Sequence, residues 1–278
     1  MTFPPPGLPQ RAPPVIRAPQ PAAPSRRFPS LDFGGGPVQA SAHVADGTGL
    51  WSAVGWTVVG LGFLFGTLLT TGILLVLLLI GAVAAWFQAK KTRALLNGQG
   101  VRVQADQLPE LHACVESFAS RLGLTHVPET YVLEDGALNA FAMKLAGRHT
   151  LLLTDDAVWG ALQSKNPQSL GFLVAHELAH FALGHTGWFR ATVRASFPPL
   201  KRLDELSADN VALALVGDTQ VAFDGIKLLI TGPQLSHFIN DDALRAQAEE
   251  VVAARISKKA ERAMSHPLNL RRLHNVLR

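Results

Sequence analysis

The chain has 278 residues, of which only 17% are charged, with 25 Lys and Arg against 21 Asp and Glu. With 48% hydrophobic residues and a mean hydropathy of +0.20, it is too apolar for an ordinary soluble enzyme or a disordered chain. A single cysteine, Cys114, excludes an intramolecular disulfide and any cysteine-rich zinc module. The chain has no basic run interleaved with aromatic residues and no glycine-rich phosphate loop, so we expect no nucleic-acid partner.

The N-terminal part is rich in proline, with 11 of the 18 prolines in the first 37 residues. We expect residues 1–50 to be a disordered Pro-rich tail, because such a segment buries too little apolar surface to offset the entropy of ordering it. Residues 6–9 and 21–24 fit the PxxP pattern of polyproline ligands. Weak docking through the tail is therefore the alternative to a plain linker.

An apolar stretch follows, and its 43 residues from Gly47 to Ala89 include no Asp, Glu, Lys, Arg or His. A bilayer core needs about 20 helical residues. The sequence therefore predicts a transmembrane segment over residues 51–88. It is either a hairpin that turns near residues 66–72 or a single span over roughly 68–88.

Positive charges follow this segment at Lys90, Lys91 and Arg93, whereas residues 31–50 contain no Lys or Arg. The positive-inside rule then predicts a membrane protein whose C-terminal domain lies on the cytoplasmic side.

Residues 95–278 carry the pattern of one α+β domain. Apolar residues at helical spacing predict a helix over residues 108–122, and short β-like runs predict strands over 130–133, 139–143 and 149–154. We expect these strands to form a small antiparallel sheet. The rest reads as mostly helical, with predicted helices over residues 168–183, 201–216, 219–230, 241–263 and 268–277.

The predicted helix 168–183 carries the motif His176-Glu177-Leu178-Ala179-His180. Two histidines four residues apart lie on one helix face, so both rings can bind a single zinc ion. Glu177 points about 100° around the helix from His176, where it can act as a base on water beside the ion. A buried His–Glu cluster without metal is the alternative, although unpaired polar groups are costly to bury in a helix this apolar.

A third ligand is needed, because catalytic zinc usually has three protein ligands and an open position. The metzincin pattern would place Gly at 183 and His at 186, but these positions hold Leu183 and Thr186. His185 lies beyond the expected helix end and is therefore a poor third ligand. Glu205 comes 25 residues after His180 and can complete a His-His-Glu site. Asp209 lies one turn further on the same face, where it can accept the outer N–H of a zinc histidine.

Taken together, these motifs resemble the HtpX and type I CAAX prenyl protease family of membrane-associated zinc metallopeptidases. Four features match in order, over roughly residues 95–278: Asn139-Ala-Phe-Ala142, the HELAH helix with Gly184-His185, Glu205-xxx-Asp209, and Ser265-His266-Pro267 with Arg272. The chain looks like a compact bacterial member. The resemblance implies a zincin-like, mostly helical metallopeptidase domain with one zinc ion per chain, behind a transmembrane anchor in the bacterial inner membrane.

The sequence also departs from the family. HtpX proteins have further hydrophobic segments after the zinc helix, and none stands out in this sequence. The CAAX proteases are much larger than this chain. A prenylated substrate is therefore not implied.

The resemblance implies further roles. Asn139 and Ala140 would lie on an edge strand that pairs with a peptide substrate. His266 would hydrogen-bond substrate or the developing oxyanion. Arg272 would bind substrate or pair with a site carboxylate. The alternatives are an ordinary strand, a helix-breaking turn and a structural arginine, respectively.

We therefore expect a membrane-anchored zinc metalloendopeptidase that hydrolyses internal peptide bonds of protein substrates, with Glu177 as general base. By resemblance its role would be membrane protein quality control. A hydrolase that uses the same zinc chemistry on a non-peptide amide is one alternative. The other is a catalytically inactive, metal-binding membrane scaffold that acts through the Pro-rich tail, against which the intact Glu177 argues.

Overall fold

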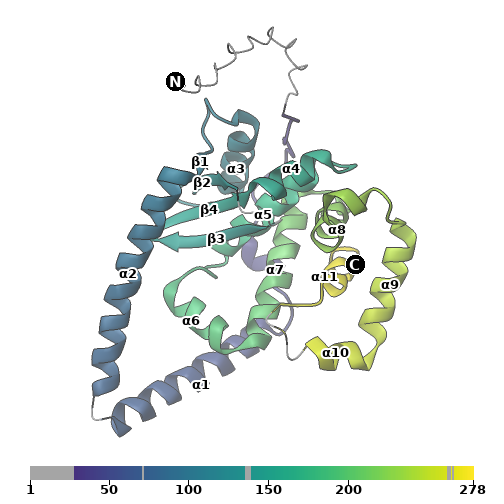
Figure 1. Cartoon of the computed structure of the whole chain (residues 1–278). Helices are drawn as coiled ribbons and strands as arrows, with labels where there is room; N and C mark the ends of the chain where they lie inside the picture. The colour runs from purple at the N-terminus through teal and green to yellow at the C-terminus, as the bar shows by residue number, and fades with distance from the viewer. Residues whose placement is uncertain (1–27, 71, 135–138, 262–263, 265) are drawn as a thin grey trace, which may run out of the picture.

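The computed structural model describes residues 28–70, 72–134, 139–261, 264 and 266–278. Within these ranges the chain is mostly helical and has one four-stranded sheet, which confirms the α+β prediction. Figure 1 shows the sheet on one side of two central helices, with further helices on the other side and two long helices projecting away from the domain.

The sheet consists of β1 (Val101–Arg102), β2 (Glu129–Leu133), β3 (Ala140–Leu145) and β4 (Arg148–Thr154), in the order β1-β2-β4-β3. The predicted antiparallel sheet is wrong in one respect, because β2 and β4 pair in parallel. The reason is that β3 and β4 form a hairpin whose second strand inserts next to β2. The hairpin therefore leaves β3 at the edge of the sheet.

A helix is present at each predicted position, and most of these helices differ from the prediction by small shifts of their ends. Two helices were not predicted, α4 (Asp155–Gln163) and α6 (Trp188–Ser196), and the predicted helix 241–263 is broken at Ala254. α8 runs beyond its predicted end, past a kink at Gly232. The other helices of the domain are α3 (Pro109–Arg121), α5 (Ser169–Ala182), α7 (Pro198–Val216), α8 (Thr219–Ser236), α9 (Asp241–Ala253), α10 (Arg255–Glu261) and α11 (Asn269–Val276).

The helix α5 lies at the centre of the hydrophobic core. It packs against α3, α4, α7 and α8 and against the sheet. Its apolar residues Leu170, Phe172, Val174 and Leu178 are fully buried. Because tight packing fixes α5 on several sides, side chains on its remaining face are held in rigid positions.

The apolar stretch forms two helices, α1 (Thr48–Leu69) and α2 (Ile73–Gln99), each long and apolar enough to cross a membrane. They meet at a turn where Gly72 has a φ of 86°, a left-handed conformation that favours glycine. From there they diverge, α1 toward α6 and α7 and α2 toward the sheet (Figure 1). Of the two predicted arrangements, the hairpin is the one that the structure contains.

The second helix extends well beyond the predicted boundary at residue 88. Its polar end reaches the sheet, where Arg93 Nη2 lies 2.6 Å from Glu129 Oε1. α2 is therefore joined directly to the domain.

Residues 28–46, which we call the strap, lie against the domain and contact α3. Leu31 is only 4% exposed, and the ring of Phe33 lies 5.2 Å from that of Phe118. The Val38 N–H donates to the Arg121 carbonyl at 2.8 Å. The prediction of a disordered tail to residue 50 is thus wrong for the strap, because its apolar side chains find places in the core. Residues 1–27 of the predicted tail lie outside the described residues.

Candidate metal centre

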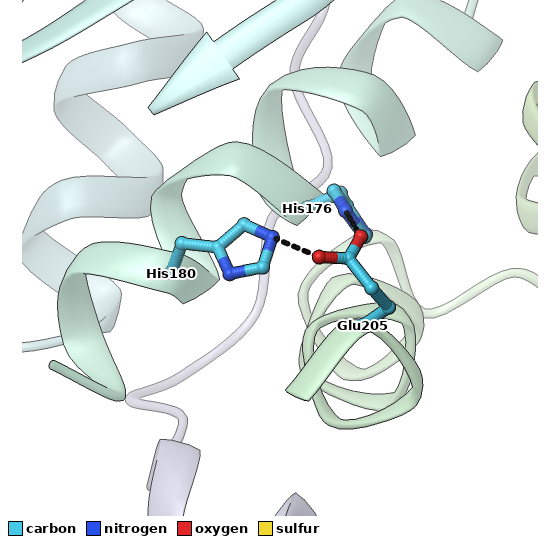
Figure 2. A group of neighbouring side chains, drawn as sticks. All are labelled: His176, His180 and Glu205. Atoms are coloured by element: carbon cyan, nitrogen blue, oxygen red, sulfur yellow. Dashed lines mark ion pairs between the residues drawn. The ribbon is translucent and has the colours of Figure 1, made fainter. Parts of the chain in front are cut away.

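Two neighbouring helices bring the three predicted metal ligands together. His176 and His180 stand one turn apart on α5, and Glu205 faces them from α7 (Figure 2). Glu205 Oε2 lies 3.5 Å from His176 Nε2, and Glu205 Oε1 lies 3.8 Å from His180 Nε2. All three side chains are buried, and one ligand atom from each lies within 4.8 Å of the others.

This donor set fits zinc. A tetrahedral zinc ion with bonds of about 2.0–2.2 Å places neighbouring ligand atoms roughly 3.4 Å apart, which is close to the two spacings observed. Two imidazoles and one carboxylate are also the ligand set of several catalytic zinc sites. The residues present are therefore suited to one zinc ion.

The outer side of His176 is held by two charged residues. His176 Nδ1 lies 2.8 Å from Asp209 Oδ1. Asp209 is fully buried, and the Arg272 guanidinium donates to both of its carboxylate oxygens. This contact turns His176 so that Nε2 points to Glu205. It engages Arg272 with a site carboxylate, one of the two roles that the sequence left open.

Burial and neighbouring charges set the protonation of the metal-free site. Burial lowers the pKa of His176, but the Asp209 charge outweighs it and raises the pKa to about 9. Burial, above all, lowers the pKa of His180 to about 3. Burial raises the pKa of Glu205, yet the neighbouring His176 and His266 rings hold it well below its usual range. A metal ion therefore meets an ionised Glu205 and a neutral His180, and must displace one proton from His176.

A cleft of about 700 Å³ opens over the three ligands, between β3 and the segment before α11. Glu177 lines it, half-buried, next to the ligand histidines. Burial raises the pKa of Glu177 and the Glu205 charge adds to the rise, while the His176 charge and the Ala142 N–H oppose it. A carboxylate with a raised pKa beside the ligand cluster is suited to accept and return a proton.

One wall of the cleft is the exposed edge of β3. The Thr154 N–H donates to the Asn139 carbonyl at 3.0 Å. The backbone N–H and C=O groups of Asn139 and of every second residue after it therefore point toward β4. Ala140 and Ala142 therefore direct their backbone groups away from the sheet, and both line the cleft. The Asn139 side chain accepts the Ala140 N–H at 2.9 Å. Ala140 thus presents its backbone at the free edge, as the resemblance implies, whereas the backbone N–H and carbonyl of Asn139 both bond to Thr154.

His266 lies on the opposite wall of the cleft. Its side chain is 54% exposed, and Nδ1 lies 3.8 Å from Glu205 Oε2. The ring therefore borders both the ligand cluster and the open space above it.

Sequence reasoning missed a buried network behind His180. His185 Nδ1 lies 2.8 Å from His180 Nδ1, and His185 Nε2 lies 3.3 Å from Asp204 Oδ1. Arg194 lies 3.0 Å from Asp204 Oδ2 through Nε and 2.9 Å from Glu205 Oε1 through Nη2. The available signals were the position of Asp204, directly before the predicted ligand, and a third histidine close behind the motif.

His185 reaches this place because α5 ends in a left-handed turn. Gly184 has a φ of 71°, and the His185 N–H donates back to the His180 carbonyl at 2.9 Å. The turn folds His185 onto the helix, so a position beyond the helix end contacts the candidate ligand His180.

One comparison with known proteins bears on this site. Residues 105–194 match the model of Peptidase family M48, a stretch that runs from the start of α3 into α6 and includes His176, Glu177 and His180. No solved structure matches the chain. The match is consistent with the resemblance that the motifs indicated, at the level of Peptidase family M48, and supports a metallopeptidase. It ends before Glu205, so the third ligand depends on the geometry.

Proposed function

We propose, from the match of residues 105–194 to Peptidase family M48, that the chain is a membrane-anchored zinc metalloendopeptidase acting on internal peptide bonds of proteins. The observation that carries the proposal is the buried cluster of His176, His180 and Glu205, with Glu177 beside it in an open cleft. The cluster would bind the metal ion, Glu177 would supply the base, and the cleft would give a peptide access to both.

In the proposed reaction, His176, His180 and Glu205 would hold the zinc ion. Zinc bound there would supply Lewis acidity, which polarises the scissile carbonyl and lowers the pKa of water. Glu177 takes a proton from the attacking water and returns it to the leaving amine. The Asp209–Arg272 pair keeps His176 oriented throughout.

The substrate in this proposal is an extended peptide that lies along β3. Ala140 and Ala142 point their backbone groups into the cleft, so a peptide strand can hydrogen-bond to them as an added strand. His266, exposed on the opposite wall, is placed to donate to the oxyanion that develops on the scissile carbonyl.

The anchor in this proposal is the α1–α2 hairpin. Its side chains near the turn are largely exposed, for example Leu68 (72%), Leu69 (73%) and Ile73 (62%), as expected for a lipid-facing surface. The positive charges after residue 89 favour a cytoplasmic active site. By resemblance, the enzyme would act in membrane protein quality control at the bacterial inner membrane.

A catalytically inactive scaffold is the competing proposal. Such a protein has no need of a general base, yet Glu177 is present and faces the cleft. The peptidase therefore accounts for one residue that the scaffold leaves unexplained.

The deciding experiment is casein hydrolysis by the detergent-purified full-length protein. We expect hydrolysis that a chelator abolishes and zinc restores. Glu177→Gln should keep bound zinc and lose nearly all turnover, while Glu116→Gln, an exposed acid on α3, should behave as wild type. Proteolysis by purified Glu177→Gln at the wild-type rate would overturn the assignment of the base, and a wild-type protein without activity would favour the scaffold.

A further inference from the structure

We propose that His185 is a positioning residue for the metal ligand His180, and that Asp204 fixes the tautomer of both rings through a buried chain of hydrogen bonds. This inference rests on the proposed metal site, because it assigns His180 Nε2 to the metal. It gives His185 and Asp204 roles that neither the motif nor the family match assigns to them.

The first link is the contact between the two histidine rings. Their Nδ1 atoms lie 2.8 Å apart, and the residues are only 6% and 3% exposed. At this distance one nitrogen donates and the other accepts. His180 Nε2 faces Glu205 and is the nitrogen available to a metal, so a neutral His180 carries its proton on Nδ1. His180 is therefore the donor and His185 the acceptor.

The second link follows from the first. If His185 Nδ1 accepts, its single proton is on Nε2, which lies 3.3 Å from Asp204 Oδ1. A carboxylate is an acceptor, so the two contacts agree on one arrangement of protons. The order is metal, His180, His185 and Asp204, with each ring donating outward.

Asp204 is fully buried, and two arginines of α6 compensate its charge. Arg190 Nη2 lies 2.6 Å from Oδ1 and Arg194 Nε lies 3.0 Å from Oδ2. Arg190 also hydrogen-bonds to Ser52 on α1 through Nη1. This series of polar contacts begins at the proposed metal ligand His180 and ends at Ser52 on α1. The helix α1 is therefore part of the support of the site.

The test is zinc affinity, measured by chelator competition on the full-length protein in detergent. Loss of a group that orients a metal-bound histidine typically costs roughly 10–100-fold in metal affinity, and we expect this for His185→Ala. His185→Asn should recover part of the loss, because its amide oxygen can take the place of ring Nδ1 and accept from His180. The control is His149→Ala. It removes a β4 histidine whose ring stacks on Phe181 of α5, with the ring centroids 4.5 Å apart, and it should leave the zinc affinity unchanged.

Two results would overturn the inference: His185→Ala binding zinc as tightly as wild type, or His185→Asn binding no better than His185→Ala. Either result, with zinc-dependent casein hydrolysis intact in the wild type, removes the role of His185 and leaves the proposed function standing. A wild-type chain that binds no zinc would remove both.

A second measurement does not depend on any variant folding. Nitrogen-15 NMR of the histidine rings in the zinc-loaded wild-type protein reports which ring nitrogen carries each proton. We expect His185 to be protonated at Nε2 and bare at Nδ1. The opposite tautomer would contradict the proposed order of donors.

Discussion

Arg272 donates to Asp209 through two parallel hydrogen bonds, Nε to Oδ2 at 2.8 Å and Nη2 to Oδ1 at 2.7 Å. The same Oδ1 atom lies 2.8 Å from Nδ1 of the ligand His176. Because Arg272 belongs to α11, this pair connects the C-terminal helix to the candidate metal centre. The site is therefore assembled from helices nearly 100 residues apart in sequence.

Removal of Arg272 leaves Asp209 buried without a cation. We expect Arg272→Gln to lower the free energy of unfolding by about 3–5 kcal/mol, the usual cost of breaking a buried ion pair from one side. Urea unfolding followed by circular dichroism measures the loss. The matched variant Arg148→Gln removes an exposed arginine that pairs with Glu129 and should cost at most about 1 kcal/mol. Equal stability of the two variants would contradict a structural role for the Arg272–Asp209 pair.

The stability of the metal-free protein should pass through a maximum near pH 6.5. Above that pH the folded state keeps the His176 proton, up to its pKa of about 9, while the unfolded state has lost it, so stability falls. Below that pH the unfolded state gains protons that His180 and His185 do not take up when folded, since burial lowers their pKa values to about 3 and about 2. Stability therefore falls in that direction as well.

Thermal unfolding in the presence of a chelator, from pH 4.5 to pH 9, measures this profile. With zinc bound, His176 has already lost its Nε2 proton, so the decline between pH 6.5 and pH 9 should disappear. A metal-free profile that rises steadily to pH 9 would show that His176 is not protonated in the folded state.

A wedge between α1 and α6 should weaken the support of the metal site. A Cβ atom added at Gly55 would lie 2.8 Å from Val193 Cγ1 and 3.5 Å from Phe197, so Gly55→Leu must push the two helices apart. We expect a loss of about 1–3 kcal/mol in stability and a lower zinc affinity. Gly60→Leu, on the same helix with no neighbouring atom within 4 Å, is the control. Zinc affinity that falls equally in both variants would argue against a role for α1.

The edge of β3 can be tested without disturbing the ligands. Ala142→Pro removes the backbone N–H that faces Glu177, and an edge strand tolerates proline better than a central strand does. We expect kcat/KM on casein to fall at least about tenfold with zinc still bound, since one lost hydrogen bond costs about 1.4 kcal/mol or more in such a site. Lys144→Pro alters the same register further from the cleft and should have a smaller effect. Identical losses would point to a general distortion of the sheet.

The parts of the fold that could be predicted are those encoded by local patterns. The helical spacing of apolar residues fixes α5, and the four-residue interval between His176 and His180 fixes their common face. The parallel pairing of β2 and β4 was missed, because strand neighbours depend on contacts distant in sequence. The strap was missed for a related reason, since its sparse apolar residues Leu31 and Phe33 show no periodicity.

The same distinction applies within the site. The motif spacing predicted Glu177 and brought His176, His180 and Glu205 together, as the geometry now shows. The local pattern around His185 shows a glycine and a third histidine, but it does not show that the turn at Gly184 folds His185 back onto His180. Arg190 and Arg194 lie on α6, a helix that was not predicted, so their contacts with Asp204 depend wholly on tertiary structure.

For the proposed membrane anchor, the contact between the strap and the domain limits how the chain can cross a bilayer. Phe33 packs on Phe118, and both apolar helices lie between these residues along the chain. Residues in contact occupy the same side of a membrane, so the number of crossings between them must be even. A single crossing would separate Phe33 from Phe118, whereas an out-and-back passage through α1 and α2 returns the chain to its partner. During synthesis the strap is made before α3 and α5, so it has to remain on that side of the membrane until these helices are made and can bind it.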